Sequence, residues 1–514
     1  MPLELPALVA SGMVIQRDEP VTIWGKCDES VRLAFRGETY DATPDDNNEW
    51  SVQLNRQSVG GPFEMTINDV TLTEVYVGDV WLASGQSNMQ MNMERCKYMY
   101  PEEMREVNPD IRQFLALPRY DYSTERTDPQ GEWKGVKPDT IGEFSAVAYF
   151  FAKRLQSKYY TPIGGKIPIG IILCAVGGTR VHAWMSKGSL ADFPDLIAEA
   201  DEYADMERVW DIIDHDNNES QKFFNMINEM DQGLAEQWYE PEYDDSEWES
   251  RDLLTPWEGT RSVWMRKTVD IPEDWDGKQA TLFFGSVKDW DMAYVNGEFV
   301  GNTTYRWPPR EYEIPKLQAG RCVITLRIIS IEKGWCTPGK PYMLRTSSSA
   351  ILLDGEWRFK AGDEVSPLEP ATNFNYIATG LYNGMLKPLT RYRIKGAIWY
   401  QGESDALDPE CYSGRFGKLV EQWRADWGYD FPFVFTELVH WEEENWDAVR
   451  KEQRNCLKLP NVAMVSADAL GEYNDLHPIN KQPIGDRLAR CAMRIAYGDT
   501  MPISPFEIVA AKWK

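Results

Sequence analysis

The amino-acid sequence predicts an α/β protein whose parallel sheet is covered by helices on both faces and is interrupted by an inserted all-β domain. Three observations lead to this prediction. The chain has 514 residues, which is too long for one compact core. Continuous apolar runs alternate with amphipathic stretches, a pattern typical of a buried parallel sheet with crossover helices. A tryptophan-rich stretch of short alternating strands separates two regions of that pattern.

Residues 1–75 form the first predicted domain, which resembles a small β-sandwich. Short strand-like runs such as VTIWGK, VRLAFRG and EWSVQL are separated by turn signals such as RGE and DDNN. Short strands at this spacing are typical of a sandwich.

The α/β domain is predicted in two parts, residues 76–232 and 368–498. The first part contains the apolar runs VWLAS and IPIGIILCAVGG, and the second contains GAIWY, FPFVFTEL and NVAMVSADAL. Residues 233–367 between them are predicted as the inserted β domain, where VNGEFVG carries the Asn-Gly signal of a tight hairpin. Residues 499–514 are left as a C-terminal tail without a predicted role.

The composition excludes several classes of partner. The net charge of −27 would repel nucleic acid and anionic membranes, so neither is expected as a partner. No run of about twenty apolar residues is present to span a bilayer. The first residues, MPLELPALVASG, lack the basic stretch and apolar core of a signal peptide, which leaves a cytosolic protein or a mature exported one. The oligomeric state is not readable from the sequence.

The eight cysteines are scattered along the chain and predict neither a metal site nor a cofactor. No CxxC pair and no Cys/His spacing typical of a zinc site occurs among them. Most are expected to be small buried hydrophobes, and any disulfide pairing is unreadable.

Polar motifs follow three of the predicted parallel strands. VWLAS runs into GQSNM, IILCAV runs into GGTRVHAWM, and GAIWY runs into QGESDA. A fourth polar stretch, DLHPINKQPIGDRLA, lies in the last loop and helix of the domain. Because functional residues of such sheets gather at the carboxyl ends of the strands, these four stretches are expected to form one site.

A serine nucleophile needs an adjacent base, and the chain has only four histidines. His215 lies in the acidic run HDNNES and is expected in solvent, while His440 ends a strand-like run. His182 follows GGTR, and His477 follows Asp475 in a loop before a helix, which is the best placement for a base.

The predicted mechanism is nucleophilic attack by Ser87 on an ester carbonyl. His477 would take the serine proton and Asp475 would orient the imidazole. The backbone of Ser87, the amide of Gly177 and the carboxamide of Gln401 would donate to the oxyanion. Each signal is weak by itself, because a serine after a strand is more often a helix N-cap and GQSNM lacks the G-x-S-x-G elbow.

Taken together, the motifs resemble the sialate O-acetylesterase family, a branch of the SGNH hydrolases. The matching stretches are GQSNM, GGT, WYQGES and DLHPINKQPIGDRLA, in the family's order, and LPALVASGMVIQRDEPVTIWG resembles the β domain that opens many bacterial members. The resemblance implies an SGNH-type three-layer α/β/α hydrolase with Ser87 as nucleophile, His477 as base, and Gly177 and Gln401 as oxyanion donors.

The acid of the triad stays open between two residues. SGNH enzymes commonly carry an aspartate three residues before the histidine, where this chain has Asn474, and Asp475 follows it. Some related carbohydrate esterases look as though they use the glutamate of the QGE stretch, which is Glu403 here. Asp475 is the favoured prediction.

The inserted domain resembles the jelly-roll sugar-binding module of family-two glycoside hydrolases. VWMRKTVDIP, FFGSVKDWDMAYVNGEFVG and PREYEIP carry this resemblance. Its tryptophans, including Trp264, Trp290 and Trp307, are candidates for sugar stacking, although core packing is the favoured reading.

Four residues near the motifs are candidates for substrate binding: Asn88, Arg180, His182 and Trp399. Arg180 could contact a substrate carboxylate, but an ion pair with acidic neighbours is the favoured alternative.

The sequence as a whole predicts a secreted or periplasmic carbohydrate O-acetylesterase, with a cytoplasmic location left open. It would act through an acetyl-serine intermediate without metal or cofactor, and its partner would be an acetylated carbohydrate. Sialic acids, xylan, xyloglucan and pectin stay open as substrates. The alternative from another class is an inactive carbohydrate-binding protein, which the intact Ser87, Gln401 and His477 disfavour.

Overall fold

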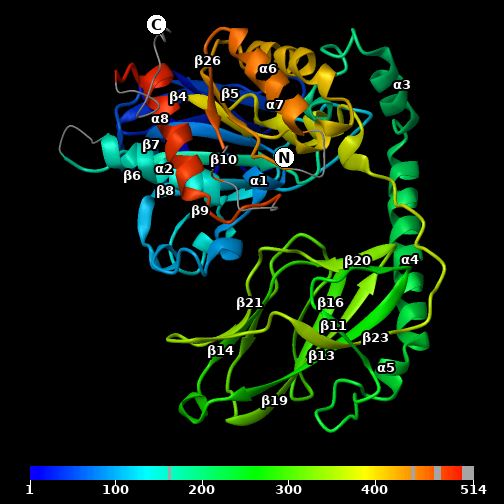
Figure 1. The fold of residues 1–514 in the computed structure, drawn as a ribbon. Helices are drawn as coiled ribbons and strands as arrows, with labels where there is room; N and C mark the ends of the chain where they lie inside the picture. The colour runs from blue at the N-terminus through cyan, green and yellow to red at the C-terminus, as the bar shows by residue number, and fades with distance from the viewer. Residues whose placement is uncertain (160–163, 442–445, 468–469, 471–475, 501–514) are drawn as a thin grey trace, which may run out of the picture. The chain divides into compact units, whose positions relative to one another are not determined.

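The computed structural model describes residues 1–514 except 160–163, 442–445, 468–469, 471–475 and 501–514. The chain forms two compact units (Figure 1). Unit 1 consists of Met1–Val209 and Asn373–Lys514, and unit 2 is the intervening Trp210–Thr372. Unit 2 therefore begins within the long helix α4 (Met206–Met230).

A parallel sheet forms the centre of unit 1, as the apolar runs predict. Its strand order is β26-β25-β24-β7-β10-β8-β9, and every neighbouring pair is parallel except β8 and β9. All residues of β10, β24 and β25 are buried, which explains their continuous apolar sequences. The strand bounds are β7 Val70–Gly85, β8 Asn108–Ala116, β9 Gly131–Val136, β10 Ile169–Ala175, β24 Gly396–Tyr400, β25 Phe433–Glu437 and β26 Val462–Ser466.

Helices cover both faces of this sheet. On β7, Trp81 packs edge-on against Phe151 of α2, with 5.1 Å between ring centroids. Trp399 of β24 pairs in register with Ser84, three residues beyond Trp81, so its side chain points to the opposite face. There it packs at 5.6 Å against Trp423 of α6. The helices involved are α2 Ala146–Lys158 and α8 Gln482–Tyr497, which pack together, and α6 Tyr412–Trp427 and α7 Trp446–Asn455.

The long strand β7 belongs to two regions of unit 1. Its first half pairs with β1 and β6, and its second half pairs with β10 and β24. The predicted boundary between residues 75 and 76 falls inside this strand. The remaining N-terminal strands are β1 Val14–Gln16, β2 Val21–Lys26, β3 Val31–Phe35, β4 Glu38–Ala42, β5 Glu49–Leu54 and β6 Gly60–Ile67.

Unit 2 is built from antiparallel sheets around an apolar core. A six-stranded sheet has the order β11-β23-β13-β19-β16-β17, and a four-stranded sheet has the order β18-β14-β21-β22. Side chains from both sheets, such as Met265 and Leu282, share one core cluster. The strand bounds are β11 Glu249–Asp252, β13 Arg261–Ile271, β14 Ala280–Phe284, β16 Trp290–Val295, β17 Glu298–Thr303, β18 Glu311–Ile314, β19 Gly320–Ser330, β21 Tyr342–Arg345, β22 Ala350–Leu352 and β23 Glu356–Ala361.

The Asn-Gly hairpin of unit 2 is confirmed. Asn296 and Gly297 connect β16 and β17 with φ angles of 49° and 83°, as the tight turn requires. Of the three tryptophans named above, Trp264 is fully buried and packs on Trp238, whereas Trp290 is half-buried and stacks on Phe224 at 3.4 Å. Trp264 is therefore a core residue, as the sequence favours.

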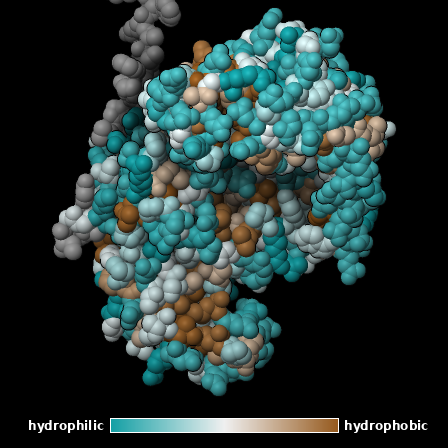
Figure 2. All heavy atoms as spheres, turned by 90° about the horizontal axis from the view of Figure 1, so that it is seen from below, coloured by the Kyte–Doolittle hydropathy of each residue, from teal (hydrophilic) through white to brown (hydrophobic). Residues whose placement is uncertain are grey.

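The surface is mainly hydrophilic, and most cysteines are buried, as the composition predicts. Hydrophilic residues cover most of the face drawn in Figure 2, and the hydrophobic ones form separate patches. In the described part of the chain, no helix is long and apolar enough to cross a membrane. None of the eight cysteines, all of which lie in the described residues, forms a disulfide, and all but Cys411 are buried.

Replacing Gly85 by alanine tests how closely β7 and β24 approach. Gly85 has a φ of 132°, and an added Cβ would lie 2.1 Å from the Tyr400 carbonyl oxygen. We expect Gly85→Ala to lower the free energy of unfolding by about 1–3 kcal/mol through strain and by about as much again through overlap. Urea denaturation measures the loss.

Gly428→Ala is the matched control for strain alone. Gly428 has a φ of 77° at the end of α6, and an added Cβ meets nothing within 4 Å. Gly428→Ala should lower the free energy of unfolding by only about 1–2 kcal/mol. Equal losses in the two variants would contradict the close approach at Gly85.

Candidate active site

The carboxyl end of β7 presents Ser87 at the centre of the sheet. The strand ends at Gly85, and the chain turns at once into the short helix α1 (Ser87–Gln90), of which Ser87 is the first residue. β7 lies between β10 and β24, which come before and after the insertion in the chain. This is the point where the strand order reverses, which is where open α/β sheets place their ligand sites.

The Ser87 hydroxyl and the His477 imidazole are in hydrogen-bond contact. Ser87 Oγ lies 2.7 Å from His477 Nε2, although 390 residues separate them in sequence. His477 is 4% exposed, whereas His215 and His440 are exposed. A half-buried hydroxyl at this distance from a buried imidazole is the arrangement of a nucleophile and its base. The predicted acid, Asp475, lies outside the described residues.

The two carboxamides beside Ser87 bind neighbouring loops. Asn88 Nδ2 donates to Glu403 Oε1 at 2.6 Å and to the Leu476 carbonyl at 3.0 Å, and its Oδ1 accepts from Lys481 Nζ. Asn88 is fully buried, and both its amide nitrogen and its amide oxygen have partners, so substrate contact by Asn88 stays a prediction. Because Leu476 precedes His477, Asn88 fixes the backbone that carries the imidazole. Gln86 Oε1 accepts from the Gly402 amide at 3.3 Å.

Glu403, the alternative acid, is a buried carboxyl on the far side of Asn88. It is 5% exposed and lies in the short 3₁₀ helix Glu403–Leu407. Burial raises its pKa to about 7, and the hydrogen bond from Asn88 opposes that rise. Its observed partner is thus the carboxamide next to the nucleophile.

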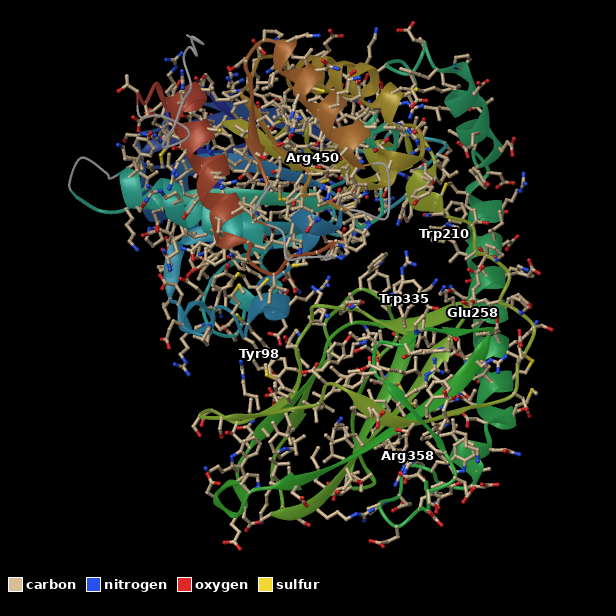
Figure 3. All side chains as sticks on the ribbon, viewed as in Figure 1. Tyr98, Trp210, Glu258, Trp335, Arg358 and Arg450 are labelled. Atoms are coloured by element: carbon tan, nitrogen blue, oxygen red, sulfur yellow. The ribbon has the colours of Figure 1, made fainter. Side chains whose placement is uncertain are left out.

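Glu437, at the end of β25, is a further buried carboxylate, and arginines neutralise it. Arg454 Nε lies 2.6 Å from its Oε1, and Arg450 Nε lies 3.9 Å from the same oxygen. Arg450 projects from α7 (Figure 3). Glu437 therefore has a structural ion pair and is no candidate acid.

Gly177 lies directly beside the nucleophile. A Cβ added to it would be 3.3 Å from Ser87 Cβ. Its amide donates to Gln90 Oε1 at 2.8 Å, and the Gln90 side chain is exposed. An exposed side chain can turn away, so this amide is open to exchange its partner for a substrate oxygen.

Gln401, a predicted oxyanion donor, binds two groups of the neighbouring loops. It is fully buried, and its Nε2 donates to the Thr179 carbonyl at 2.9 Å and to Asp405 Oδ2 at 2.5 Å. Both of its N–H groups have nearby acceptors in this structure, and its donation to an oxyanion stays a prediction.

Of the other three predicted substrate contacts, His182 and Trp399 are fully buried and Arg180 is half-buried. Arg180 pairs with Asp408 and lies 3.8 Å from Asp405, which is the ion-pair alternative. His182 is fully buried, and its Nε2 donates to the Tyr376 carbonyl at 2.7 Å. Trp399 is also fully buried, among the aromatic rings of the core. Substrate contact by Arg180, His182 and Trp399 stays a prediction.

Sequence reasoning missed three residues that hold the site together. Lys481 binds Asn88, Asp405 binds Gln401, and Asn375 Nδ2 donates to the Gly177 carbonyl at 2.9 Å. Lys481 and Asp405 lie within the quoted motifs, but Asn375 follows the insertion and no pattern marks it. Among the described residues, no cluster of His, Cys, Asp and Glu could hold a metal ion.

Comparison with known proteins identifies the same region. A family model described as a carbohydrate esterase, sialic acid-specific acetylesterase, matches residues 77–213 and 369–494, together just over half of the chain. Sialate O-acetylesterases of Mus musculus and Homo sapiens are 32% and 30% identical over 143 and 157 residues. These stretches cover 23% and 27% of this chain and only 26% and 29% of the relatives.

A solved structure extends the similarity of fold to nearly the whole chain. A carbohydrate acetylesterase from Xanthomonas citri matches with a TM-score of 0.59 and 23% identity. The match covers 98% of this chain and 77% of that one.

Replacing His182 tests its buried neutral state. Burial, Arg180 and Arg415 lower the pKa of His182 from 6.5 to about 3. Below about pH 6.5 the unfolded chain therefore binds a proton at this histidine, whereas the native state does not. As the pH is lowered from there, the free energy of unfolding decreases by up to about 1.4 kcal/mol per pH unit. His182→Gln should be less stable than wild type at pH 7.5, and the gap should narrow or reverse by pH 4.5. Urea denaturation at both pH values measures it.

His215→Gln, at an exposed position, is the control and should keep a constant difference from wild type. A gap that is constant for His182→Gln as well would contradict the buried neutral imidazole.

Proposed function

The chain belongs to the carbohydrate esterases of the sialic acid-specific acetylesterase family, and on this premise we propose that it is a serine esterase that removes O-acetyl groups from a carbohydrate. The observation that carries the proposal is the 2.7 Å contact between Ser87 Oγ and His477 Nε2 at the carboxyl edge of the sheet. The chain spans less than a third of the length of its curated relatives, so the activity rests on this geometry and on the family.

In the proposed first step, Ser87 Oγ attacks the acetyl carbonyl carbon while His477 Nε2 takes the hydroxyl proton. The amides of Ser87 and Gly177 stabilise the resulting oxyanion, with Gly177 exchanging Gln90 for the substrate oxygen. The tetrahedral intermediate then expels the sugar alkoxide, which receives the proton from His477. Acetyl-serine and the free sugar hydroxyl are the products of this step.

In the second step, water attacks the acetyl-serine carbonyl and gives its proton to His477. Collapse of the second tetrahedral intermediate breaks the bond to Ser87 Oγ, which takes the proton from His477, and releases acetic acid, which ionises to acetate. Asp475 is proposed to orient the imidazole and to stabilise the imidazolium in both steps.

The proposed substrate is an acetylated sialic acid, with acetylated plant polysaccharides as alternatives. Acetylated sialic acid is supported by the names of the family model and of the mammalian relatives. Because Arg180 is held by Asp405 and Asp408, it is not a free cation for a sialate carboxylate, and acetylated xylan, xyloglucan and pectin stay alternatives. Acetate release across this panel distinguishes them. A secreted or periplasmic location suits either substrate class.

Ser87→Ala tests the nucleophile. Loss of the attacking oxygen should lower kcat/KM for p-nitrophenyl acetate and for the acetylated glycans by at least about 10³-fold, because only transition-state binding remains. Acetate release and p-nitrophenol absorbance measure it, and circular dichroism checks the fold.

Ser84→Ala is the matched control, because it removes a fully buried hydroxyl from the same strand, three residues before the site. It should retain wild-type kinetics. Equal rates for wild type and Ser87→Ala would rule out the serine mechanism, and a wild type that releases no acetate would favour the inactive binding protein.

Asp475→Asn and Glu403→Gln decide which carboxylate orients His477. Asp475→Asn should lower kcat by up to about 10⁴-fold, because the asparagine favours the wrong imidazole tautomer. Glu403→Gln should lose far less, because the new carboxamide oxygen can still accept from Asn88. Steady-state kinetics of both variants measure this, and nearly full activity in Asp475→Asn would exclude Asp475 as the acid.

A further inference from the structure

Asp405 is a buried carboxylate that joins the two loops flanking Ser87. It is fully buried. Its Oδ2 accepts the backbone N–H of Val181 at 3.0 Å and an N–H of the Gln401 side chain at 2.5 Å. Val181 follows β10 and Gln401 follows β24, so one carboxylate oxygen holds the loops on either side of β7.

The loop after β10 is fixed at three points. Thr179 Oγ1 donates to the Val176 carbonyl at 2.9 Å and closes the turn that contains Gly177. The second N–H of Gln401 donates to the Thr179 carbonyl at 2.9 Å. Together with the bond from Val181 to Asp405, these contacts hold the whole stretch from Val176 to Val181.

A charge network keeps Asp405 compatible with its burial. Arg180 Nε lies 3.8 Å from its Oδ1, and Arg180 also pairs with Asp408. Arg415 Nη1 in turn lies 2.7 Å from Asp408 Oδ2. Two carboxylates and two guanidinium groups thus compensate one another, which a buried charge requires.

We propose that Asp405 is a positioning residue, which locks the loop from Val176 to Val181 against Gln401 so that the Gly177 amide stays beside Ser87. The inference rests on the proposed function, because it assigns the Gly177 amide to the oxyanion. It also gives Gln401 a structural role, because its carboxamide binds both Asp405 and the Thr179 carbonyl. Since the oxyanion develops only in the transition state, a misplaced Gly177 amide lowers kcat and leaves KM nearly unchanged.

Two substitutions at Asp405 test the inference. Asp405→Ala removes the shared acceptor and should lower kcat by about 10²-fold, the size of effect expected when a reacting geometry shifts by about 1 Å. Asp405→Asn can present its carboxamide oxygen to the same two N–H groups and should recover much of that loss. A thermal melt of each variant confirms that it folds.

Asp408→Asn is the matched control. It removes a carboxylate from the same arginine network, in which the Asp408 side chain pairs with Arg180 and Arg415. Among the described residues that side chain bonds neither Gly177 nor the Gln401 carboxamide, so kcat should stay at the wild-type value. Hydrogen exchange of the amides at residues 177–181 gives a readout that is independent of activity. Exchange there should be faster in Asp405→Ala than in wild type and unchanged in Asp408→Asn.

The outcomes separate the two proposals. If Asp405→Ala keeps wild-type kcat while Ser87→Ala is inactive, the positioning role is wrong and the esterase proposal stands. If Ser87→Ala is as active as wild type, the esterase proposal fails, and exchange rates alone then decide whether Asp405 fixes the loop. Unchanged exchange in Asp405→Ala overturns the inference in either case.

Discussion

The parallel register of β7 with its two neighbours determines the rest of the site. Gly85, the last residue of β7, pairs with Ala175 at the end of β10 and with Tyr400 at the end of β24. The three strands therefore end at the same level of the sheet, and this places the loops that follow them next to one another. A shift of register by one residue would turn each strand's side chains to the other face and move Ser87 away from Gly177.

The polar groups that emerge at this edge are mainly occupied with one another. Asn88, Gln401 and Asp405 are fully buried, and each has at least two polar partners. Buried amides and carboxylates are costly unless they are paired, so the network restricts each loop to one conformation. Ser87 and Gly177 are half-buried and keep access to a substrate. The site thus contains buried side chains that fix the loops and a few accessible groups to which the chemistry is proposed.

The sequence predicts the strands better than the use of the side chains. Buried strands such as β10 are recognisable because every residue is apolar or small, and the hairpin at Asn296 is recognisable because its turn needs positive φ angles. The pairing of His477 with Ser87 followed from the small number of histidines and the order of the motifs. The partners of Gln401 and Arg180 could not be read, because a side chain's partner depends on loops brought together from distant positions. Asn375 had no signal at all for the same reason.

The insertion of unit 2 leaves this edge intact because the chain closes again within unit 1. Arg180 N donates to the Asn375 carbonyl at 3.3 Å, and Thr379 N donates to the His182 carbonyl at 3.1 Å. The His182 ring adds the bond to Tyr376, and the Asn375 side chain binds the Gly177 carbonyl. The segment that returns from the insertion is therefore hydrogen-bonded to the loop beside Ser87. Every described residue to which a chemical role is proposed belongs to unit 1, on one side or the other of the insertion in the sequence.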